Sequence, residues 1–163
     1  MLKKTAILLL VVALLAGGLV GYALFRSSLQ VVGKDLQTCP AQQDTALFEK
    51  LRSSLERSGL EGTVFRTPTL GDPSNYAYYV YTLRVKNPGL LTAEMVELQL
   101  SPLSDDILFY TDTAEVILKP GETRDLKCVL FTEGAPHAVR DFYITYYLWG
   151  HPYEVKFTYD DIR

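Results

Sequence analysis

The chain has 163 residues, of which 48% are hydrophobic and 21% are charged, and its formal net charge is −3. This length suits one domain, and the apolar fraction excludes a mainly disordered chain. The acidic balance argues against a nucleic-acid partner, because binding to phosphates requires a basic surface.

The N-terminal segment begins with Lys3 and Lys4 and continues through Thr5–Phe25 without a charged residue. A helix of this length would be about 31 Å long, which matches the apolar core of a bilayer. We therefore expect residues 1–26 to form an uncleaved membrane anchor. The alternative is a cleaved secretory signal, whose apolar stretch is usually shorter. The leucines expected to anchor the segment are Leu8, Leu9, Leu10, Leu14 and Leu15.

The position of the lysines predicts the orientation of this anchor. Positive charge next to a membrane segment usually stays in the cytoplasm. The rest of the chain is then expected outside the cytoplasm, held by a single membrane pass, or secreted if the segment is cleaved. Both alternatives place the following domain in the same compartment.

Residues 27–60 are expected to form a tether that contains a short amphipathic helix. Asp44 can cap a helix through its carboxylate, and Gly59 can end one. These signals and the apolar spacing between them predict a helix over residues 45–58. Its apolar face either packs on the following domain or mediates self-association or docking onto a membrane partner. The apolar residues are Leu47, Leu51 and Leu55, with Phe48 beside them.

From residue 61 to residue 163 the hydrophobic period changes to two, which is typical of half-buried strands. Turn sequences separate the runs, and in Pro120-Gly121 the glycine suits the positive φ of a type II turn. About seven short strands predict an all-β, antiparallel sandwich, with a closed barrel as the alternative. The alternating runs lie at residues 79–85, 96–100, 116–118, 126–130, 142–148 and 153–159, with residues 63–66 as a candidate leading strand.

Three segments carry a resemblance to a known family: Tyr81–Gly89, with its Val-x-Asn-x-Gly pattern, Glu97–Leu100, and Val116–Thr123, with Leu-x-Pro-Gly-Glu. Over residues 76–160 the chain resembles bacterial and archaeal extracellular immunoglobulin-like domains of the fibronectin-like and CARDB-like type. The resemblance implies an immunoglobulin-like sandwich. Domains of this family serve as spacers, adhesive modules or stalks of surface proteins.

The two cysteines, Cys39 and Cys128, allow one disulfide in an exported chain. This bond would hold the tether against the sandwich. The alternative is that Cys128, which lies between Leu126 and Leu130 with the inward parity of its strand, is a buried free thiol.

The motifs of catalysis and cofactor binding are missing from the sequence. It contains no nucleophile elbow, phosphate-binding loop or Cys-x-x-Cys motif, and its two histidines lack the spacing of metal ligands. We therefore expect a protein that is not an enzyme and that has no catalytic residues, metal or cofactor.

Aromatic residues form the most informative surface pattern. By strand parity Tyr143, Tyr147 and Trp149 share one outward face, and Tyr76 and Tyr78 face outward on another strand. Exposed aromatic side chains can anchor a protein partner or stack on sugars, unless the amphipathic helix covers them. We expect a membrane-anchored, extracytoplasmic immunoglobulin-like module that binds a protein partner in an envelope or surface assembly. The alternatives are a carbohydrate-binding module and a pilin-like assembly subunit.

Overall fold

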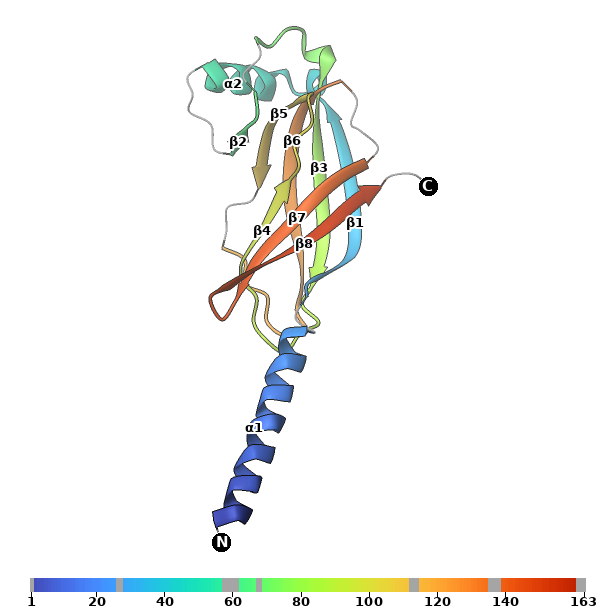
Figure 1. Cartoon of the computed structure of the whole chain (residues 1–163). Coiled ribbons are helices and arrows are strands. Elements are labelled where there is room, and N and C mark those ends of the chain that lie inside the picture. Colours follow the sequence, from blue (N-terminus) through green and yellow to red (C-terminus); the bar gives the residue numbers. More distant parts are fainter. Residues whose placement is uncertain are drawn as a thin grey trace.

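A computed structural model describes residues 2–25, 28–56, 62–66, 69–111, 115–134 and 139–160. An N-terminal helix projects from one end of a β-sandwich, which we call the proximal end, and a second helix lies at the opposite, distal end (Figure 1). These helices are α1 (Leu2–Phe25) and α2 (Thr45–Glu56), and two single 3₁₀ turns are η1 (Ala41–Gln43) and η2 (Pro73–Asn75).

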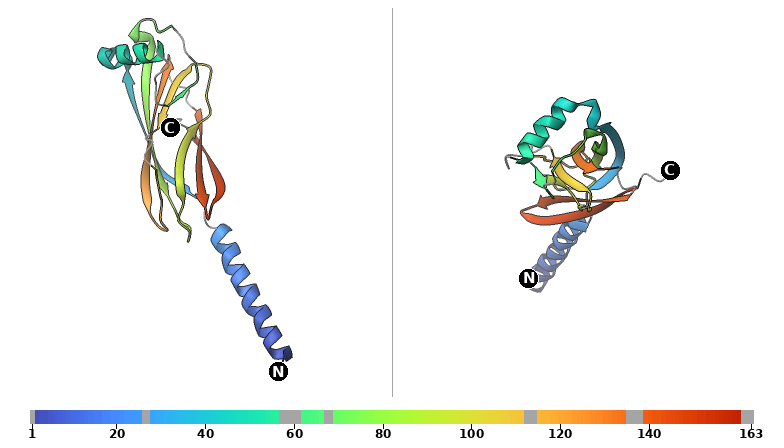
Figure 2. Two further views of the ribbon diagram at one scale, coloured as in Figure 1. Left: turned by 90° about the vertical axis from the view of Figure 1, so that its left-hand side faces the viewer. Right: turned by 90° about the horizontal axis from the view of Figure 1, so that it is seen from above.

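The strands of the described residues form two antiparallel sheets that pack face to face (Figure 2). The larger sheet has the order β1-β3-β6-β5-β2, and the smaller sheet has the order β4-β7-β8. The predicted all-β sandwich is therefore confirmed. The strands are β1 (Gln30–Pro40), β2 (Thr63–Val64), β3 (Tyr76–Lys86), β4 (Glu94–Leu100), β5 (Asp106–Thr111), β6 (Thr123–Glu133), β7 (Val139–Leu148) and β8 (His151–Asp160).

Period-two alternation places one side of each central strand in the core. In β3, Tyr81, Leu83 and Val85 are buried between the sheets, whereas Arg84 and Lys86 are exposed. Burial of large apolar side chains from both sheets supplies the main driving force for this packing. The inward-facing residues of β4 and β7, such as Leu98 and Ile144, complete the same core from the smaller sheet.

The structure corrects the expected tether over residues 27–60. Residues 30–40 form β1, which pairs with β3 along its whole length, so the sandwich begins well before residue 61. β1 is an edge strand, and most of its side chains are exposed or half-buried. Its sequence therefore lacks the regular alternation that marks a strand with one buried face.

α2 covers the distal part of the outer face of the larger sheet (Figure 2). The predicted cap is present, because the backbone amide of Leu47 donates to the Asp44 carboxylate over 2.9 Å. Phe48, Leu51 and Leu55 are buried against the sheet, which confirms that the helix packs on its own domain, whereas Leu47 is exposed. The predicted helix end at Gly59 lies outside the described residues.

α1 carries the leucines that the sequence analysis assigned to the anchor. In α1 the side chains that the structure describes are those of Thr5 and residues 7–22. Over the described residues, no helix is long and apolar enough to cross a membrane. The side chains of the five leucines are between 61% and 70% exposed, namely Leu8, Leu9, Leu10, Leu14 and Leu15.

Candidate functional site

The predicted aromatic residues do not form one surface, because they lie on different sheets. Tyr76 and Tyr78 point outward from β3 but are buried beneath α2, where they contact Phe48 and Phe131. Burial raises the pKa of Tyr78 to about 12. These two tyrosines therefore belong to a second apolar core and line no exposed surface.

Tyr143, Tyr147 and Trp149 belong to the smaller sheet and to its β7–β8 turn. Tyr143 is half-buried, with the ammonium group of Lys156 6.0 Å from its ring centroid, and Tyr147 is exposed. β7 ends at Leu148, so Trp149 lies in the turn rather than on the strand. Its side chain is 63% exposed. No helix of the described residues covers these three side chains, and their role in binding remains a prediction.

The two cysteines are both free and lie on opposite faces of the larger sheet. Cys39 is paired with Tyr78 and belongs to the outer face, whereas Cys128 is paired with Tyr81 and lies in the core between the sheets. The disulfide allowed by the sequence does not form, because the sheet backbone separates the two side chains. Burial raises the pKa of the Cys128 thiol to about 12, so the group stays protonated.

A buried ion pair joins the two sheets, and nothing in the sequence pattern indicated it. Arg140 at the start of β7 donates two hydrogen bonds to Asp106 at the start of β5, and both side chains are almost completely buried. Asp106 also accepts a hydrogen bond from the backbone amide of Leu103 over 2.7 Å. Within the described residues the carboxylate is fully engaged by these contacts, which gives it a structural role.

A groove of about 930 Å³ lies on one side of the sandwich. β4, the edge strand of the smaller sheet, forms one wall, while β2, β5 and β6 of the larger sheet form the rest. Its lining is polar and apolar in similar measure, and the apolar part includes Leu98 and Leu100 of β4 together with Phe65 and Phe109. The sequence analysis missed this groove, since it depends on how far the edges of the two sheets stand apart.

The β4 backbone offers hydrogen-bonding groups to this groove. The Ser101 amide donates to the carbonyl oxygen of Asp141, on the β7 side. Because the direction of backbone amides alternates along a strand, the amides of Leu98 and Leu100 point away from β7 and toward the groove. The start of this edge is already engaged, because the Val96 amide donates to the carbonyl oxygen of Val116 over 2.9 Å. Further along β4, no strand of the described residues pairs with it.

The charges at the rim of the groove are mainly acidic. Glu97, Glu115 and Asp125 line it, together with a single lysine, Lys127. Asp125 is already paired with Arg84 of the neighbouring strand over 2.8 Å. The other two carboxylates are exposed, so the rim favours a cationic ligand.

The opposite side of the sandwich is formed by the edge strands β1 and β8. There β1 and β8 approach one another, and the Lys34 ammonium group donates to the backbone carbonyl oxygen of Asp160. The same ammonium lies 4.6 Å from the ring centroid of Tyr159. One long side chain thus bridges this pair of edges, whereas beyond Val96 no strand of the described residues pairs with the edge of β4.

Comparison of the sequence with protein families and with curated proteins gives no match. Among solved structures, the crystal structure of a FixG-related protein from Vibrio parahaemolyticus is similar, with a TM-score of 0.36 and 16% sequence identity. The match covers 80% of this chain and 96% of that chain. At this TM-score the similarity says nothing about function. The described residues also contain no group of three or more metal-ligating side chains.

Proposed function

We propose that this chain is a non-enzymatic, membrane-anchored immunoglobulin-like module that lies outside the cytoplasm and binds an extended segment of a partner protein. The partner would belong to an envelope or surface assembly. Three features support the proposal: the order of the strands, the apolar helix α1, and the groove along β4. The groove is the observation that carries the binding function.

The strand order supports assignment of the sandwich to the immunoglobulin-like class. Constant-type immunoglobulin domains have strands A-B-E-D in one sheet and C-F-G in the other. In the present chain the order β1-β3-β6-β5 corresponds to the first sheet and β4-β7-β8 to the second. β2 is then an addition at the edge, and α2 belongs to an insertion between the first two strands.

Membrane anchoring is supported by the sequence and surroundings of α1. Residues Thr5–Phe25 carry no charge and follow two lysines. The described leucines of this helix are exposed and α1 projects away from the sandwich, so its apolar surface has no cover within the described chain (Figure 1). Such a surface is strongly disfavoured in water and is stabilised by lipid.

The groove supports binding by strand addition. An extended peptide laid along β4 would satisfy the outward-facing amides of Leu98 and Leu100 while its alternate side chains contact the apolar part of the lining. The acidic rim, with Glu97 and Glu115, favours a segment that carries lysine or arginine. We therefore expect a basic, extended segment of the partner to occupy the groove.

Site-specific photo-crosslinking in intact cells tests this function. A photoreactive amino acid at Gln99, an exposed position at the groove, is expected to give one discrete adduct. The matched control is Glu154, which is exposed on β8 at the other edge of the smaller sheet and outside the groove. Equal adducts from both positions, or none from Gln99, would refute the proposal.

Charge variants test the chemistry of the partner. Glu97→Lys combined with Glu115→Lys should abolish the Gln99 adduct, because both carboxylates at the rim become cationic. Lys127→Glu should preserve or strengthen the adduct. Mass spectrometry of the adduct should locate the crosslink in an extended, basic segment of the partner, and a crosslink to an acidic segment would contradict the assignment.

A further inference from the structure

We propose that the proximal end of the sandwich inserts apolar side chains into the interfacial region of the bilayer that holds α1. This inference rests on the membrane anchoring in the proposed function, and it adds a second lipid contact made by the folded domain itself. The side chains concerned, which we call the basal surface, are exposed and large: Leu90, Met95, Ile117, Tyr147 and Trp149.

Trp149 occupies a turn position that its side chain disfavours. Trp149 and Gly150 form the two-residue turn between β7 and β8, with φ angles of 51° and 76°. A turn with two positive φ angles is ordinarily built from Asn-Gly, because bulky side chains are strained there. A tryptophan at this place costs folding stability and gains no burial within the described chain. A contact outside the chain explains why strain and exposure coincide at one residue.

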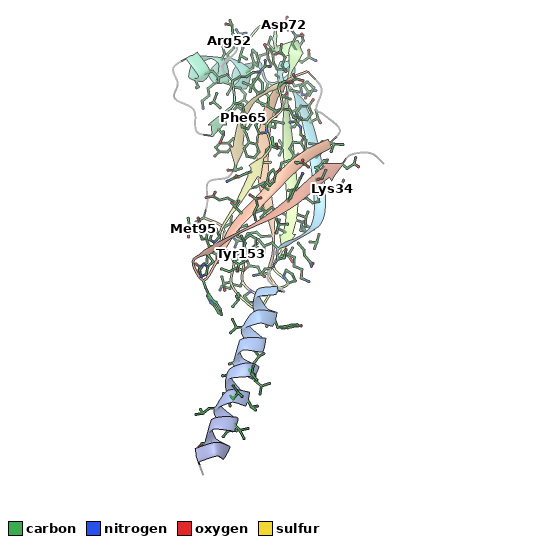
Figure 3. The ribbon with its side chains drawn as sticks, in the orientation of Figure 1. Lys34, Arg52, Phe65, Asp72, Met95 and Tyr153 are labelled. Carbon is green, nitrogen blue, oxygen red and sulfur yellow. The ribbon has the colours of Figure 1, made fainter. Side chains whose placement is uncertain are left out.

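Met95, on the neighbouring strand β4, also combines a positive φ angle with an exposed apolar side chain. It lies in an irregularity of β4 between Glu94 and Glu97, has a φ angle of 49°, and is 50% exposed. Glu94 is paired with Tyr147, so Met95 lies beside the end of β7 (Figure 3). Of the described non-glycine residues, those with positive φ are Met95 and Trp149, and both present an apolar side chain at this corner of the sandwich.

The basal surface lies at the end from which α1 leaves. The β7–β8 turn and the connection from β3 to β4 are both at the proximal end (Figure 1). Leu90 lies in that connection and is 60% exposed. Its loop is held in place by Asn87, a buried residue whose side-chain amide donates to the carbonyl oxygens of Leu91 and Leu118.

The connection between α1 and the sandwich is too short to lift this end away from a membrane. α1 ends at Phe25, and Leu29 is already buried in the sandwich core. Four residue steps span at most about 14 Å when fully extended. The headgroup region on each side of a bilayer is several ångströms thick, so the proximal loops lie within its reach when α1 is embedded.

The chemistry of the basal surface suits this depth. Tryptophan and tyrosine favour the membrane–water interface, where an apolar ring and a polar group are both accommodated. Leucine, isoleucine and methionine add apolar area that lipid can cover. We assign the surface to lipid rather than to a protein because the short connection brings it to the membrane in every copy of the chain.

Trp149 is the only tryptophan of the chain, so its own fluorescence reports the proposed contact. The full chain is reconstituted in phosphatidylcholine vesicles, with or without lipids brominated near the headgroup. We expect a blue-shifted emission, a loss of emission with brominated lipid, and protection from aqueous acrylamide. Emission that is fully accessible to acrylamide and unaffected by bromine, in protein that floats with the vesicles, would overturn the inference.

A matched variant moves the reporter to the distal end. Trp149→Phe combined with Leu47→Trp places the single tryptophan on the exposed side of α2, far from α1 (Figure 1). Its emission should be red-shifted and insensitive to brominated lipid, and equal bromine quenching at both positions would contradict a specific basal contact. Protein that fails to float with vesicles at all would instead refute the anchoring by α1, and this inference with it.

Discussion

Arg140 and Asp106 form a bidentate ion pair between the smaller and the larger sheet, with N–O distances of 2.7 and 2.8 Å. Their side chains are 1% and 0% exposed. Loss of hydration makes such a pair expensive to form, but the loss of one partner leaves the other charge buried without compensation. The pair therefore fixes how the two sheets meet more than it adds net stability.

Replacement of one partner should be much more harmful than replacement of both. Asp106→Leu is expected to lower the free energy of unfolding by about 3–5 kcal/mol, because the Arg140 guanidinium is left unpaired. The double variant Asp106→Leu/Arg140→Met should recover part of this loss. Thermal unfolding of the full chain in detergent, followed by circular dichroism, measures both effects. Arg84→Ala, which breaks an exposed pair with Asp125, serves as the control and should have a smaller effect.

The two thiols should differ sharply in reactivity. Cys39 is partly exposed, whereas Cys128 is buried and the pKa of its thiol is raised to about 12, which keeps the reactive thiolate scarce. Maleimide should label the native protein once, and Cys39→Ser should abolish the labelling. Mass spectrometry of intact protein counts the labels, and unfolding in urea should reveal the second site. A mass lower by two hydrogens without reductant would indicate a disulfide and contradict the structure.

Folding stability should decline in alkaline solution. Burial raises the pKa of Cys128 from 9.0 to about 12, and the pKa values of Tyr78 and Tyr81 from 10.0 to about 12. The unfolded chain releases the thiol proton above pH 9.0 and the tyrosine protons above pH 10.0, while the folded chain retains them, so the stability present at neutral pH is lost as the pH rises toward 12. Urea unfolding of the full chain in detergent at a series of pH values measures the slope. Cys128→Ala should flatten its first part, and an unchanged slope would exclude a contribution from this thiol.

Asn87 should tolerate almost no replacement. Its side-chain amide donates to the carbonyl oxygens of Leu91 and Leu118, and its oxygen accepts a hydrogen bond from the backbone amide of Gly89. Asn87→Asp places a carboxylate oxygen against two carbonyl oxygens, so the loss should exceed the roughly 1–3 kcal/mol expected for each unsatisfied buried group. Asn87→Ala should be less harmful. Unfolding by urea compares them with Asn75→Asp, an exposed site where no change is expected.

Replacement of Gly62 by alanine should destabilise the fold more than the same replacement of Gly71. Gly62 has a φ angle of 113°, and an added Cβ would lie 2.7 Å from the carbonyl oxygen of Phe109. Gly62→Ala should cost about 1–3 kcal/mol through backbone strain and should loosen β2 from β5. At Gly71 an added Cβ meets only the Tyr76 hydroxyl at 3.9 Å, so Gly71→Ala should be nearly neutral. Hydrogen exchange of the Phe65 amide, which donates to the carbonyl oxygen of Ile107 over 2.9 Å, measures the loosening, and equal exchange in both variants would contradict it.

Alternation of hydrophobic residues was enough to find most of the strands. β7 and the second half of β3 bury one face, and in β8 half-buried and exposed residues alternate, so these sequences alternate as well. The turn at Pro120-Gly121 was also predicted correctly, since Gly121 has a φ angle of 78° and the amide of Glu122 donates to the carbonyl oxygen of Lys119. These signals are local, and local signals are legible in a single sequence.

The edges and the contacts between sheets could not be found in the same way. β1 and β2 are edge strands with little regular burial, and β5 buries four successive residues rather than alternate ones. Cys39 and Cys128 lie on opposite faces of the larger sheet because of the register in which β1 pairs with β3, and the sequence does not reveal this register. The ion pair of Arg140 with Asp106 and the groove along β4 likewise depend on how distant segments meet in space.

The short connection between α1 and β1 has a mechanical consequence. A pull on α1 acts on β1 at once, because Leu29 is already part of the core. β1 runs from the proximal end toward the distal end and pairs with β3 from Gln30 to Pro40. Tension applied lengthwise is then shared by the whole ladder as shear, rather than opening its hydrogen bonds one after another. The β1–β3 ladder, rather than a flexible tether, is therefore the part of the domain that resists a pull on α1.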